Sequence, residues 1–167
     1  MAAGLGVLLI SSEALLAGPS SRDVFSDPQT AALAEATLSR NAGRAAELVA
    51  AGAHPNARSD RNVTLLQWAM LNRSHGGFSI LLDLGADPAL PGLDGDGAIH
   101  FAAKANDVAY LRMILERRGV VDARNIATGR TPLMEALTGD RMAQFDMLRA
   151  AGARLDLADT MGNTPLH

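Results

Sequence analysis

Cysteine is absent from the 167-residue chain, and aromatic residues are scarce, with four Phe, one Trp and one Tyr. Without cysteine the chain has no disulfide, no thiolate nucleophile and no thiolate metal site. Positive charge is not in excess either, because 15 Lys and Arg stand against 18 Asp and Glu. This balance argues against a dominant basic surface for nucleic acid or an anionic membrane. The hydrophobic content of 48% is too high for a disordered chain.

Alanine and leucine take the place of the missing large side chains, with 31 Ala and 24 Leu in the chain. Such a composition, together with 16 Gly, indicates short, closely packed helices separated by turns. A single large core normally needs bulkier side chains to fill it. We therefore expect an all-helical protein with several thin cores, which is typical of internal repeats.

Two independent landmarks recur every 33 or 34 residues. The first is a glycine that begins a Gly-Ala pair or a weaker copy of one, at Gly52, Gly85, Gly119 and Gly152. The second is an aliphatic residue, at Leu33, Leu66, Ile99, Leu133 and Leu166. An alanine follows each of the first four aliphatic residues by three positions, at Ala36, Ala69, Ala102 and Ala136. Periods of this length predict stacked helix–turn–helix units.

The best-kept copy, residues 129–136, reads Gly-Arg-Thr-Pro-Leu-Met-Glu-Ala, and residues 162–167 read Gly-Asn-Thr-Pro-Leu-His. Diverged copies lie at 62–69 and 95–103. These segments resemble the ankyrin repeat, whose pattern is Gly-x-Thr-Pro-Leu-His-x-Ala-Ala followed by an apolar helix and Gly-Ala-Asp. The resemblance implies an all-α solenoid with β-turn fingers. Helix physics agrees, because Thr is a good N-cap, Pro fits the first helical position and Gly favours a helix end.

The repeats predict the organisation of residues 29–167. We expect a degenerate capping repeat at 29–57, repeats at 58–90, 91–124 and 125–158, and the start of a further one at 159–167, so that the natural protein continues. Residues 19–28 contain two Pro and three Ser, which predicts a linker. Residues 1–18 contain an apolar run too short for a stable membrane span. This segment is either a remnant of a secretory signal peptide or a short helix that packs on the first repeat.

Motifs that carry chemistry are mostly missing, so we expect no enzyme activity, no metal and no cofactor. Asp94-Gly95-Asp96-Gly97 begins like a calcium loop but lacks the later ligands, which favours a turn between repeats. His100 and His167 stand at the ankyrin His position, where hydrogen bonding between neighbouring loops is the expected role. Trp68 is expected to fill a gap between repeats rather than to bind a partner.

Ankyrin proteins typically bind other proteins through the tips of their fingers and the concave face of their first helices. Transferred by register, this implies partner-binding residues in the fingers at Asp60, Arg61, Val63, Leu93, Asp94, Asp96, Thr128, Arg130, Thr160, Met161 and Asn163, and on the concave helical face at Leu71, Asn72, Lys104 and Thr138. Val63, Leu93 and Met161 are the most informative, because an apolar side chain at an exposed tip favours a protein interface.

The resemblance implies a monomeric, non-catalytic protein-binding module, with neither nucleic acid nor a membrane span. The divergent repeats and the apolar leader are similar to small periplasmic ankyrin proteins, some of which act as immunity partners of a secreted toxin enzyme such as a phospholipase. A periplasmic or cell-envelope location is therefore expected, with the cytoplasm as the alternative. The alternative function is a scaffold arm of a larger protein whose activity lies in its C-terminal part.

Overall fold

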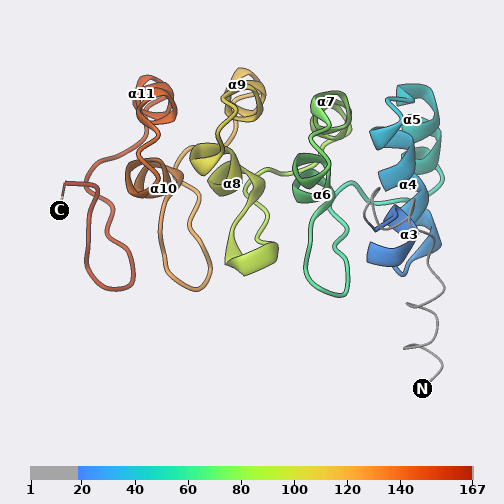
Figure 1. Cartoon of the computed structure of the whole chain (residues 1–167), viewed down its shortest axis with the longest axis horizontal. Helices are drawn as coiled ribbons and strands as arrows, with labels where there is room; N and C mark the ends of the chain where they lie inside the picture. Colours follow the sequence, from blue (N-terminus) through green and yellow to red (C-terminus); the bar gives the residue numbers. More distant parts are fainter. Residues whose placement is uncertain (1–18, 167) are drawn as a thin grey trace.

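The computed structural model describes residues 19–166. Figure 1 shows an elongated row of helix pairs, with inner helices in one layer, outer helices in a second, and hairpin loops that project away from the outer layer. The inner helices are α4 (Pro28–Leu38), α6 (Leu65–Leu71), α8 (Ala98–Lys104) and α10 (Pro132–Thr138); the outer helices are α5 (Ala42–Ala50), α7 (His75–Asp83), α9 (Ala109–Glu116) and α11 (Met142–Ala150). The predicted all-α, ankyrin-like solenoid is confirmed.

The loops between repeats form four fingers. Finger 1 comprises residues 58–64 and is closed by an isolated antiparallel bridge between Arg58 and Thr64. Fingers 2, 3 and 4 comprise residues 91–97, 124–131 and 158–164. Finger 2 contains the short 3-10 helix η1 (Leu93–Gly95). The calcium-like residues 94–97 therefore form a turn between repeats, as expected.

The inner helices begin where the sequence predicts. The Thr64 hydroxyl accepts a hydrogen bond from the backbone N–H of Gln67, and the Gln67 side-chain oxygen accepts one from the N–H of Thr64, which completes a capping box. The Thr131 hydroxyl likewise accepts from the backbone N–H of Met134, although Met134 returns no bond, and Pro132 occupies the first helical position. Both caps satisfy backbone donors that would otherwise lack a partner.

The repeated aliphatic and alanine positions make up the core. Leu33, Leu66, Ile99 and Leu133 expose at most 2% of their surface. The alanines three residues later are also buried, with Ala36 the most exposed of them at 6%. Because alanine adds so little bulk, neighbouring inner helices can approach closely. This packing explains why the chain needs few aromatic residues.

The glycine landmark is out of register in one repeat. Gly52, Gly85 and Gly152 follow their outer helices with positive φ angles, but in the third unit the residue with positive φ is Arg118, at 55°. Gly119 instead donates its N–H to the carbonyl of Ile114. In the other three repeats the residue after the glycine makes the equivalent bond, as Ala86 does to Leu81. The expectation that Gly119 ends the helix is therefore wrong by one residue.

The extra residue of the 34-residue step lies in finger 3. Its closing hydrogen bond joins the N–H of Asn125 to the carbonyl of Arg130, five positions later. In finger 1 the equivalent bond joins Ser59 to Val63, only four positions apart. Finger 3 thus contains one residue more than the other fingers.

Residues 19–28 are not a linker. Residues 21–24 form the short helix α3 (Ser21–Val24), and Phe25 is buried with 2% exposure. The Phe25 ring meets Trp68 edge-on, with 6.0 Å between ring centroids, and the Trp68 indole N–H donates to the Ser21 hydroxyl. Trp68 is 6% exposed and packs against this N-terminal segment. The expected signal remnant, residues 1–18, lies outside the described residues.

Candidate protein-binding surface

The fingers are joined to one another along the row. The Asn62 side chain donates to the carbonyl of Gly92 at 2.7 Å, which links fingers 1 and 2. The backbone N–H of Ile126 donates to Gly95 at 3.1 Å. The N–H of Thr160 donates to Thr128 at 2.9 Å, which links fingers 3 and 4. Contacts at all three junctions hold the finger tips as one continuous surface.

Buried side chains of the inner helices support the fingers from behind. Gln67 is fully buried, and its amide nitrogen donates to the carbonyl of Asp96 at 2.9 Å. His100 is also fully buried; its Nδ1 accepts from the N–H of Gly97, so Nε2 carries the proton and donates to the carbonyl of Arg130 at 3.0 Å. Burial lowers the pKa of His100. The expected loop-bonding role of His100 is confirmed, whereas His167 lies outside the described residues.

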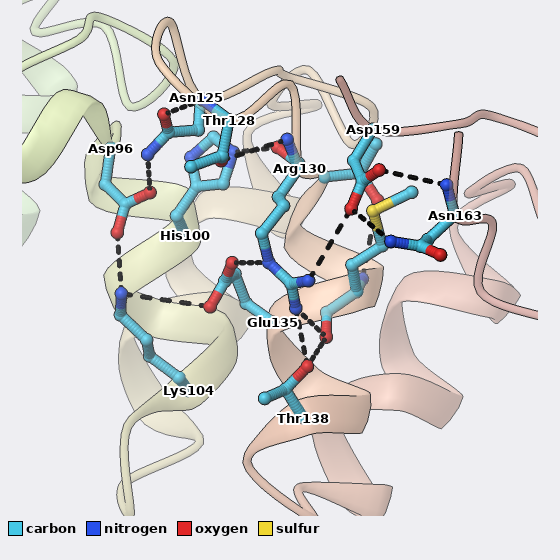
Figure 2. Close-up of polar contacts among 12 residues, drawn as sticks. Asp96, His100, Lys104, Asn125, Thr128, Arg130, Glu135, Thr138, Asp159 and Asn163 are labelled. Atoms are coloured by element: carbon cyan, nitrogen blue, oxygen red, sulfur yellow. Dashed lines mark hydrogen bonds and ion pairs between the residues drawn. The ribbon is translucent and has the colours of Figure 1, made fainter. Parts of the chain in front are cut away.

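A chain of alternating charges crosses the same region in Figure 2. Lys104 Nζ lies 2.6 Å from Asp96 Oδ2 and 3.9 Å from Glu135 Oε2. Glu135 also accepts from Arg130 Nε at 2.6 Å, and Arg130 Nη1 lies 3.9 Å from Asp159 Oδ2. These five side chains connect the second, third and fourth fingers, so their first role is to hold the surface together.

The carboxylate at the end of this chain is kept ionised by its own finger. Asp159 accepts hydrogen bonds from the backbone N–H groups of Asn163 and Met161, both at 2.9 Å. The N–H of Asn163 is the largest cause that lowers the pKa of Asp159. An ionised Asp159 shapes finger 4 and faces the Arg130 guanidinium.

The predicted partner-binding residues divide by exposure. Those exposed are Asp60, Arg61, Leu71, Asn72, Asp94, Thr128, Thr138, Thr160, Met161 and Asn163, and those partly exposed are Leu93, Lys104 and Arg130. Met161 is the most open of the large apolar residues, with 84% exposure.

Two of the predicted residues are buried, which corrects their expected position. Val63 is 8% exposed and belongs to the core, because finger 1 turns its side chain inward. Asp96 is 3% exposed, because its carboxylate accepts from Asn125 at 2.7 Å as well as from Lys104. Neither offers its side chain to a partner as an open finger-tip group.

Ile126 is an exposed finger residue that the repeat register does not predict. Its side chain is 69% exposed because it lies in finger 3, where the extra residue is. Alignment with the ankyrin pattern predicts Thr128 and Arg130 as the binding residues of this finger and does not include Ile126. Only knowledge of where the insertion falls would have identified it.

A cleft of about 450 Å³ lies between α3, finger 1 and α6. Val24, Val63, Trp68 and Leu71 supply its apolar lining. Of these, Leu71 is 56% exposed. The cleft therefore joins finger 1 and the inner helix α6, both predicted to bind a partner, to the N-terminal segment, which the sequence predicts to be a linker.

Within residues 19–166, no group of three or more His, Asp or Glu side chains is placed to hold a metal ion. No helix in the same range has the length and hydrophobicity to cross a bilayer.

Comparison with known proteins gives relatives but no family model that matches. Protein PhlB of Serratia liquefaciens is 48% identical over 110 residues, which cover 66% of this chain and 48% of PhlB. The mitochondrial disaggregase of Bos taurus is 31% identical over 98% of this chain and 24% of its own length. The B-cell lymphoma 3 protein homolog of Mus musculus is 29% identical over 72% of this chain and 28% of its own length.

The chain thus spans about half of PhlB and about a quarter of the other two relatives. The similarity to the lymphoma protein and the disaggregase agrees with the helix pairs and fingers described above. Together they support a chain of ankyrin-like repeats, a class of domain that interacts with proteins.

Proposed function

We propose that the chain is a non-catalytic, monomeric module that binds a protein partner through its finger tips and concave face. The observation that carries this proposal is the joined row of fingers, which presents Arg61, Asp94, Ile126 and Met161 to solvent while hydrogen bonds join each finger to the next. A preorganised surface loses little conformational entropy on binding. Exposed apolar tips among charged residues are typical of a protein interface.

Site-specific photo-crosslinking tests this proposal. A photo-reactive phenylalanine analogue in place of Met161 should give one discrete crosslinked species in the native host, because the Met161 side chain is almost fully exposed at a tip. The matched control carries the analogue at Glu47, which is exposed on the outer helix α5. Crosslinking of equal yield at both positions, or at neither, would contradict binding through the fingers.

The finer proposal is that the partner is a secreted toxin enzyme, which the chain inhibits in the periplasm or cell envelope. The support is the resemblance to small exported ankyrin proteins; residues 1–18 would direct export. If this is correct, the captured partner should be a hydrolytic enzyme whose activity falls to zero at one equivalent of the chain. A partner that keeps full activity in the complex would favour the scaffold-arm alternative instead.

A further inference from the structure

The cleft between α3, finger 1 and α6 is large enough to admit an apolar side chain, and part of its lining is apolar. Its volume of about 450 Å³ lies within the ~300–1,000 Å³ typical of ligand pockets. Trp68 and Val63 form part of its lining and are nearly buried, whereas Leu71 is more than half exposed to solvent. Apolar surface that is kept open in this way gains free energy when an apolar group covers it.

Charged groups also line the cleft, and acidic groups outnumber basic ones. Asp23 and Asp60 contribute two carboxylates, against one guanidinium from Arg61. Asp23 accepts hydrogen bonds from the backbone N–H and the hydroxyl of Ser20, at 2.9 and 2.8 Å. The Ser20 N–H is the main cause that lowers the pKa of Asp23, so this carboxylate stays charged at neutral pH.

An apolar lining with an acidic excess complements one kind of protein segment. We propose that this cleft receives an apolar side chain of the protein partner with a Lys or Arg next to it in sequence. The apolar side chain covers Trp68 and Leu71, and the cation lies against Asp23 and Asp60. This inference rests on the proposed protein-binding function and adds the chemistry of the partner's anchor residues.

Trp68 makes the cleft observable, because it is the only tryptophan of the chain. Its indole N–H, bonded to Ser21, gives one resolved side-chain signal in a nitrogen–proton correlation spectrum of the full chain. Titration with acetyl-Leu-Arg-amide should move this signal in a saturable way. The acidic probe acetyl-Leu-Glu-amide should bind about 2- to 5-fold more weakly, the range that a surface ion pair supplies.

Three variants sharpen the titration. Asp60→Arg should reverse the preference between the two probes, because it changes the charge balance of the cleft. Leu71→Ser should weaken both probes, whereas Met142→Ser, at a residue 50% exposed on α11, should weaken neither. The backbone signals of the other repeats report whether each variant remains folded.

Each contrary outcome overturns the inference in an identifiable way. An indole signal that no probe moves, or that both probes move equally, rules out the proposed anchor chemistry. A signal that shifts with protein concentration assigns the cleft to a second copy, and one that shifts on Leu8→Asp assigns it to residues 1–18. A silent titration with intact crosslinking at Met161 overturns only the cleft, whereas loss of that crosslink overturns the binding function itself.

Discussion

Single buried side chains decide how each finger is attached to the helix behind it. Gln67 and His100 occupy equivalent positions, and each accepts from the first backbone N–H of its helix cap and donates to a carbonyl of the next finger. The Gln67 amide accepts with its oxygen and donates with its nitrogen. The His100 imidazole can accept with one nitrogen and donate with the other only when it is neutral. The same joint is therefore indifferent to pH in one repeat and sensitive to pH in the next.

Stability should fall as His100 is driven toward protonation. Burial lowers the folded-state pKa of His100 below its ordinary value near 6.5, although Asp96 and Glu135 oppose that shift. As the pH falls below 6.5, the unfolded chain therefore binds the proton before the folded chain does. The free energy of unfolding decreases until the pH is below the folded-state pKa of His100. His100→Gln should remove this part of the pH dependence, which urea unfolding between pH 8 and pH 5 measures.

Gln67 provides the matched control for that experiment. Gln67→His should add a pH-dependent loss of stability at the neighbouring joint, since it recreates the His100 geometry one repeat earlier. At pH 8, His100→Gln should change the free energy of unfolding by less than about 1 kcal/mol, because both hydrogen bonds are kept. An unchanged pH slope in His100→Gln would show that His100 does not titrate with folding.

At the scale of the helix, the residue after each outer helix determines how cleanly that helix ends. Three of the four outer helices place a glycine at the position of positive φ, and α9 places Arg118 there. A side chain in the left-handed region costs about 1–2 kcal/mol in local sterics. The sequence predicted the helix but misplaced its end, because Gly119 stands next to the strained position rather than in it.

Arg118→Gly should stabilise the chain by up to about 1 kcal/mol, since glycine removes the steric cost but adds entropy to the unfolded state. The converse change, Gly85→Ala, should destabilise it by a similar amount at φ 93°, where an added Cβ would touch nothing within 4 Å. Thermal unfolding of both variants compares them directly. If Arg118→Gly lowers the unfolding temperature, the arginine side chain makes a contribution that outweighs its backbone strain.

At the scale of the whole molecule, stability is the sum of repeat units and the interfaces between them, and the joints are unequal. Gln67 and His100 each bond their inner helix to the next finger. The equivalent residue of α10 is Met134, whose thioether has no hydrogen to donate. Finger 4 is instead held by the backbone bond from Thr160 to Thr128 and by the Arg130–Asp159 contact at 3.9 Å. Local opening should therefore concentrate at finger 4.

Hydrogen exchange of three matched amides tests this order. Gly92, Asn125 and Asp159 each donate the bond that closes their own finger. The Asp159 amide should exchange about 10-fold faster than the other two, the equivalent of one missing hydrogen bond of about 1–1.5 kcal/mol. Met134→Gln should slow exchange at Asp159 and leave Gly92 unchanged. Faster exchange at Gly92 than at Asp159 would contradict the order.

The sequence by itself determined the period, the N-terminal helix caps and the core, because these depend on local chemistry and on apolar spacing. Thr64, Thr131 and the buried Leu33 series all lie where the repeat pattern predicts them. Tertiary structure alone decided which finger residues remain free. Val63 turns inward, Asp96 is enclosed by Lys104 and Asn125, and the N-terminal segment completes a cleft with α6. The physical reason is that exposure depends on how each finger folds back on the helices and on side chains from other segments, such as Asn125, which lies 29 residues from Asp96; a sequence pattern within one repeat does not contain these contacts.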